Sequence, residues 1–124
     1  MKKIATITTS LIETLVNNVY QIAHNNPSGF TINLNSLQLI KSGFVSAYKE
    51  TQNSFGISGL KAAITFALLI GSNTVGGWYN AANGMYYFDA SKVFENQFEA
   101  ANFGIENEQI AIFDLNDTKE IQLI

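Results

Sequence analysis

The residues that could support catalysis are few and poorly arranged for it. His24 is the only histidine of the chain and cysteine is absent, so neither a multi-histidine nor a thiolate metal site can form. A Ser-His-Asp arrangement would have to combine His24 with a serine such as Ser58. The Gly-Ile-Ser-Gly motif around Ser58 resembles a nucleophile elbow, but its second glycine falls one position early. We expect His24 to lie at the C-terminal end of a helix, where it interacts favourably with the helix dipole.

Paired carboxylates could hydrolyse a substrate if two of them converged in a cleft. Glu95 and Glu99 are four residues apart on an expected helix whose phenylalanines define the buried side, so both glutamates should face solvent. The segment 114–117, Asp-Leu-Asn-Asp, lacks the glycine and the distal glutamate of a calcium loop, and a hairpin turn accounts for it. Segment 71–77 contains glycines but matches neither the phosphate-loop nor the dinucleotide pattern. The sequence therefore predicts a protein that is not an enzyme and has no cofactor and no metal.

Charge is distributed unevenly along the 124 residues, whose net charge is −3. The first 88 residues carry five lysines and two acids, and residues 89–124 carry two lysines and eight acids, so the two segments sum to +3 and −6. There is no arginine, and the lysines do not interleave with aromatic residues, which argues against direct nucleic-acid binding. We expect the acidic last third to bind a basic partner, with a merely solvated face as the alternative. The residues assigned to this surface are Glu95, Glu99, Glu106 and Glu108.

Aromatic residues are concentrated in segment 74–88, which is predicted to form a β-hairpin around the Asn83-Gly84 turn. Side chains alternate between the two faces of such a ribbon, so one set can pack on a helix while the other lies nearer solvent. We expect Tyr79 and Tyr86 in the exposed set. Aromatic residues with a polar tip are enriched at protein interfaces, so Trp78, Tyr79 and Tyr86 are predicted to bind a partner, with core packing as the alternative.

Apolar periodicity predicts two helices in the first part of the chain. The first covers about residues 10–25 and starts with a capping box at Ser10. The second covers about residues 58–70 and is apolar around most of its circumference. Such a helix is either central to the core or buried by a second subunit.

A third helix is expected to follow the aromatic hairpin. Asp89 or Ser91 would cap its start, Phe94 and Phe98 would lie on its buried side, and Gly104 would follow its end. This assignment ends the second strand of the hairpin at residue 88.

Period-two alternation predicts strands at 30–34 and 44–48, expected to pair with each other, and a closing hairpin of 109–113 with 120–124. The order α-ββ-α-ββ-α-ββ indicates an α+β fold in which three helices cover one face of a mostly antiparallel sheet. No linker divides the chain, so residues 1–124 are expected to form one domain.

The N-terminal segment is too polar for a secretion signal, and the longest apolar run, at 62–70, is about half of the ~20 residues that a membrane span requires. We therefore expect the protein in the cytoplasm of its cell, without contact with a membrane.

Segments 75–80 (VGGWYN), 83–89 (NGMYYFD) and 109–115 (QIAIFDL), with weaker matches at 29–31 and 51–56, resemble a pattern in small proteins encoded by phages and mobile elements of Bacteroidetes-type bacteria. The Asn-rich composition without arginine is compatible with the AT-rich genome of such an element. The resemblance assigns no role to individual residues.

Accessory proteins of this kind are often inhibitors of host defence, such as anti-CRISPR and antirestriction proteins. The resemblance thus implies a non-enzymatic viral protein that binds a host protein with a basic surface, such as a defence nuclease, within the bacterial host. A structural protein that assembles into a homo-oligomer is the alternative.

Overall fold

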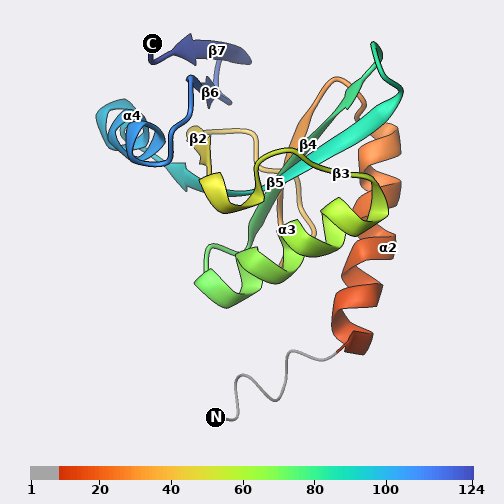
Figure 1. Ribbon diagram of the computed structural model, residues 1–124. Coiled ribbons are helices and arrows are strands. Elements are labelled where there is room, and N and C mark those ends of the chain that lie inside the picture. The colour runs from red at the N-terminus through yellow and green to blue at the C-terminus, as the bar shows by residue number, and fades with distance from the viewer. Residues whose placement is uncertain (1–8) are drawn as a thin grey trace.

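A computed structural model describes residues 9–124 and has an α+β fold with three α-helices and a seven-stranded antiparallel sheet (Figure 1). The N-terminal segment, which is too polar for a secretion signal, lies largely outside these residues. In chain order the elements are α2 (Thr9–Asn25), β1 (Phe30–Asn33), β2 (Phe44–Ala47), the 3-10 helix η1 (Lys49–Thr51), β3 (Ser54–Phe55), α3 (Gly56–Ile70), β4 (Thr74–Asn80), β5 (Met85–Phe94), α4 (Gln97–Glu106), β6 (Ala111–Asp114) and β7 (Lys119–Gln122).

The strands follow the spatial order β1-β4-β5-β2-β6-β7, and β3 pairs separately with β5. Strand β5 joins the two parts of the sheet because it is ten residues long. Its first part, to Ala90, pairs with β4, and its last part, from Ser91, pairs with β2 (Figure 1). The predicted pairing of segment 30–34 with 44–48 is therefore wrong: β1 pairs with β4, and β2 lies between β5 and β6.

The hairpin predictions are confirmed. Strands β4 and β5 pair in register from Val75–Ala90 to Asn80–Met85, and Gly84 adopts the positive φ of 74° that the tight turn requires. Strands β6 and β7 form the closing hairpin. The order of elements differs from the prediction because the 3-10 helix η1 and the short strand β3 stand between β2 and α3.

Helices α2 and α3 pack on each other and on the first part of the sheet. The apolar stripe of α2 is buried, as its spacing requires, and the helix ends at Asn25 just before Pro27. Ser10 lies within the helix and its carbonyl accepts a hydrogen bond from Thr14 Oγ1, so the predicted capping box is not formed. The core contains the fully buried side chains Val19, Ile32, Leu60, Ile64, Val75 and Phe88.

The third helix starts later than predicted, since β5 continues to Phe94 and Asn96 caps α4 by accepting a hydrogen bond from Glu99 N. Asp89 and Ser91 are therefore strand residues and not caps, and Glu95 precedes the helix. Phe98 is 81% exposed and not on the buried side.

Gly104 lies inside α4, not after it. A Cβ at this position would approach Leu123 Cδ1 to 2.7 Å, so the glycine allows the helix to pack closely on the β6-β7 hairpin. No helix within residues 9–124 is long and apolar enough to cross a membrane.

The three helices lie on one face of the sheet, as alternation along β5 shows. Phe88 packs in the core beneath α2 and α3. Phe94, six residues further and hence on the same face, contacts Phe103 of α4. Residues 87, 89, 91 and 93 therefore face the other side, which no helix covers among the described residues.

Candidate binding groove and acidic surface

The open face of the sheet is hollowed into a groove of about 850 Å³. Residues from six strands line it, so it crosses the sheet instead of following one strand. Its lining includes Thr31 of β1, Gly76 of β4, Asp89 of β5, Ala47 of β2 and Phe113 of β6, together with Gln109. A smaller hollow of about 320 Å³ shares Trp78, Asp89 and Gln109 with it and adds Tyr87 and Asn53. The volumes are those of sites that hold a small molecule or a few residues of peptide.

Asp89 forms part of the floor of both hollows. Its carboxylate Oδ1 accepts a hydrogen bond of 2.5 Å from the Ser91 hydroxyl. Burial raises the pKa of the Asp89 carboxyl to about 6, and the hydrogen bond from Ser91 offsets only part of this rise. The carboxylate is thus charged near neutral pH, but the hydrogen bond from Ser91 offsets only part of its desolvation cost.

Gly76 keeps this floor open. It lies opposite Asp89 in the β4-β5 register and opposite Thr31 in the β1-β4 register. A Cβ at Gly76 would come within 3.4 Å of Asp89 Oδ1 and 3.3 Å of the Phe30 carbonyl oxygen. Backbone and side chains therefore approach each other closely at this glycine, and any larger residue would fill the space beside the carboxylate.

An aromatic ridge of Phe55, Trp78 and Tyr87 borders the hollows. The Trp78 and Tyr87 rings stack with centroids 5.6 Å apart and an interplanar angle of 21°, and Phe55 lies 5.8 Å from Tyr87. The Tyr87 hydroxyl accepts a hydrogen bond from Asn83 Nδ2 at 2.8 Å, which ties the ring to the hairpin turn. Trp78 nevertheless remains 47% exposed.

The other predicted aromatic residues lie on the opposite side of the ribbon. Tyr86 is half-buried between Tyr79, 4.8 Å away, and His24 of α2, 4.6 Å away. Tyr79 is 36% exposed at the edge of this cluster. Tyr79 is thus exposed as expected, whereas Tyr86 packs against a helix, and the structure separates both from Trp78.

The four predicted acidic residues lie on α4 and its flanks and are all exposed. Glu99 and Glu106 are helical, Glu95 precedes the cap, and Glu108 follows the helix with a positive φ of 60°. Asp114 does not join them: its side chain is buried and accepts hydrogen bonds from the backbone N–H groups of Asn116 and Asp117, which confirms its turn role.

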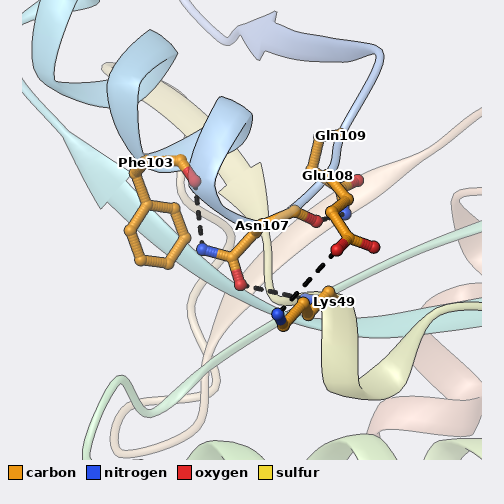
Figure 2. A network of polar contacts seen from close by, with 5 residues as sticks. All are labelled: Lys49, Phe103, Asn107, Glu108 and Gln109. Atoms are coloured by element: carbon orange, nitrogen blue, oxygen red, sulfur yellow. Dashed lines mark hydrogen bonds and ion pairs between the residues drawn. The ribbon is translucent and has the colours of Figure 1, made fainter.

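A polar network fixes the segment after α4 (Figure 2). Asn107 Nδ2 donates to the Phe103 carbonyl at 3.0 Å, and Asn107 Oδ1 accepts from Lys49 N at 3.1 Å. Gln109 Nε2 donates to the Asn107 carbonyl at 2.9 Å. The Lys49 ammonium lies 4.0 Å from Glu108, the one ion pair among residues 9–124. This network holds both an acidic residue and the groove residue Gln109 against η1.

Within the described part of the chain, no three histidine, aspartate or glutamate residues gather closely enough to hold a metal ion. The ring of His24 points to its own helix and to aromatic neighbours: its Nδ1 lies 2.8 Å from the Tyr20 carbonyl oxygen, and the two rings are 4.6 Å apart. The groove itself offers the carboxyls of Asp89 and Glu120, the aromatic surface of Trp78 and the amide of Gln109.

No family model matches the chain, and the searches of curated proteins and of solved structures found no similar protein.

Asp89, Phe55 and Tyr87 were not predicted as site residues. The signal for Asp89 was available in the sequence, because Tyr87, Asp89 and Ser91 continue the period-two alternation of the aromatic strand beyond residue 88. The preference of aspartate and serine for helix caps outweighed this signal.

Proposed function

We propose that the protein is a non-enzymatic binding protein of a phage or mobile element that inhibits a host-defence nuclease of the anti-CRISPR or antirestriction type. The observation that carries the proposal is the exposed acidic surface of Glu95, Glu99, Glu106 and Glu108. Only Glu108 has a cation within ion-pair distance among residues 9–124. The mobile-element setting rests on the resemblance of segments 75–89 and 109–115.

An acidic surface is suited to a nuclease because nucleases bind phosphate through basic surfaces. Carboxylates on a helix can occupy such a surface and exclude the nucleic acid. Complementary charge also accelerates encounter, and it disfavours partners of like charge. The rigid attachment of the segment after α4 by Asn107 supports this use, since little conformational entropy remains to be lost there on binding.

The test is phage plating on a bacterial host that has an active CRISPR or restriction system. Expression of the chain should raise the plating of a targeted phage, and the double variant Glu99→Lys, Glu106→Lys should lose most of this effect. The matched control is Glu13→Lys, Glu50→Lys, which changes net charge equally at exposed positions outside α4. Equal protection by both double variants would refute the acidic-surface mechanism, and no protection in any defended host would refute the function.

Self-assembly is a second candidate, because α3 leaves Ile57, Leu69 and Ile70 between 51% and 63% exposed. Its buried side, which packs on α2 and the sheet, is formed by Gly59, Leu60, Ala63, Ile64 and Ala67. Sedimentation of the wild type and of Leu69→Glu, Ile70→Lys decides this, since an oligomer held by α3 should dissociate in the variant. A monomer at high micromolar concentration would exclude it.

A further inference from the structure

The groove contains a charge that no cation balances. Lys41 and Glu120 are the other charged residues on its lining, Tyr87 of the smaller hollow is the remaining titratable group, and none of these forms an ion pair with Asp89. Within residues 9–124 the Asp89 carboxylate accepts one hydrogen bond, from Ser91. A half-buried carboxylate with so little compensation gains more from a cation than a fully exposed one, since part of its desolvation cost has already been incurred on folding.

An exposed indole lies beside this carboxylate. Trp78 pairs with Tyr87, and two positions along the strands Gly76 pairs with Asp89. Trp78 and Asp89 are therefore diagonal neighbours on the open face of the sheet. Both line the same two hollows. Tyr87 covers part of the indole by stacking, which holds the ring in one orientation while 47% of Trp78 stays exposed.

We propose that this groove binds an arginine side chain presented by an extended basic segment of the partner protein, with Asp89 pairing with the guanidinium and Trp78 stacking on it. The proposal deepens the proposed function and rests on it for the basic character of the partner. It adds a second contact, on the face of the sheet opposite α4.

Arginine fits this pair of groups better than lysine. A guanidinium is planar, so it can stack on an indole and still donate two parallel hydrogen bonds to a carboxylate. It is also less strongly hydrated than an ammonium group, which reduces the cost of entering a groove. A carboxylate floor excludes phosphate, so nucleic acid and anionic lipid headgroups do not suit this site.

The shape of the groove favours an extended segment over a folded surface. About 850 Å³ accommodates a few residues. The groove crosses β1, β4, β5, β2, β6 and β7, and Gln109 offers an amide at its side for a peptide backbone to bond. Gly76 leaves free the space next to Asp89 that the guanidinium would fill.

The experiment is a titration of the full chain with a capped pentapeptide that has one arginine between two pairs of glycines. Trp78 is the only tryptophan, so its fluorescence and its indole N–H resonance report directly on the site. We expect a saturable change with the arginine peptide, at least tenfold weaker binding with the lysine peptide, and no saturable change with the glutamine peptide. Equal responses to arginine and glutamine would overturn the proposal, and equal affinity for arginine and lysine would overturn the guanidinium assignment.

Asp89→Asn should weaken arginine-peptide binding at least tenfold, and Glu13→Gln, the matched loss of one exposed carboxylate outside both proposed surfaces, should leave it unchanged. With the Asp89 pKa at about 6, wild-type affinity should fall about tenfold between pH 7 and pH 5 as the carboxylate is protonated. Asp89→Asn should lack this dependence, which separates it from titration of Lys41, Glu120 or Tyr87. Unchanged affinity in Asp89→Asn, with the fold verified by the dispersion of its amide resonances, would overturn the proposal.

The peptide titration and the phage-plating test can fail independently. Peptide binding without any protection of phage would support the arginine site in the groove and refute the proposed function. Protection that depends on Glu99 and Glu106, together with no arginine-specific response at Trp78, would retain the function and refute the groove.

Discussion

The two faces of the β4-β5 hairpin differ in burial and in charge, although the same two strands form both. Under the helices, Phe88 and Ala90 are at most 2% exposed and belong to the hydrophobic core. On the open face, one residue further along the strand, Asp89 is charged near neutral pH and lies next to a half-exposed Trp78. Because alternation places these residues one position apart, the same strand contributes to the core and to the candidate binding groove.

The first way to test this difference between the faces is to remove a large ring from each. Phe88→Ala should lower the free energy of unfolding by about 3–5 kcal/mol, because it leaves a cavity in a closely packed core. Trp78→Ala should lower it by about 1 kcal/mol, since the half-exposed indole loses mainly its stacking on Tyr87. Urea denaturation of both variants measures the difference, and equal losses would show that the open face is as much core as the covered one.

The second test uses the pH dependence of stability. The Asp89 pKa is raised in the folded state, so the native protein binds this proton more tightly than the unfolded chain does. Its contribution to stability is therefore full below pH 4 and is lost as pH rises through about 6, a loss of at most about 3 kcal/mol. Asp89→Asn removes the titration, so at pH 7 it should be more stable than the wild type by about 1–3 kcal/mol.

The measurement is urea denaturation of Asp89→Asn and of wild type near pH 4 and pH 7. All other carboxylates titrate in both proteins, so the difference between them isolates Asp89. Wild-type and variant stabilities that change in parallel with pH would contradict a half-buried carboxylate that is only partly compensated by Ser91 on the open face.

The local features of the ribbon were predictable, and its long-range partners were not. The Asn83-Gly84 turn and the alternating aromatics predict the β4-β5 hairpin because turn chemistry and register are encoded within a few residues. The pairing of β1 with β4 depends on Phe30 packing against Gly77, 47 positions away, where a Cβ would approach the Phe30 ring to 2.7 Å. No local pattern encodes such a fit.

The candidate site was predicted in part for the same reason. Trp78 and the exposed glutamates follow from residue type and local period. The groove needs six strands to come together. Its Asp89 was assigned to a helix cap because an aspartate within a strand is unfavourable on propensity alone. Its retention there, at a cost in stability, is the kind of local inconsistency expected where a site has a function.

The smallest expected effect concerns the end of the covered face, where Lys92 follows the apolar residues Phe88 and Ala90 on the same side of β5. Its ammonium lies 5.3 Å from the Phe94 ring centroid and 5.7 Å from that of Phe103 on α4. Lys92→Met keeps most of the apolar stem but removes the cation, so it should lower stability by about 0.5–1 kcal/mol. Lys92→Ala should cost slightly more because the stem is also lost. If Lys92→Met proved neutral while Lys92→Ala did not, packing of the apolar stem alone would account for the contact. The cation would then add nothing to stability, and apolar packing would stabilise the covered face along its whole length.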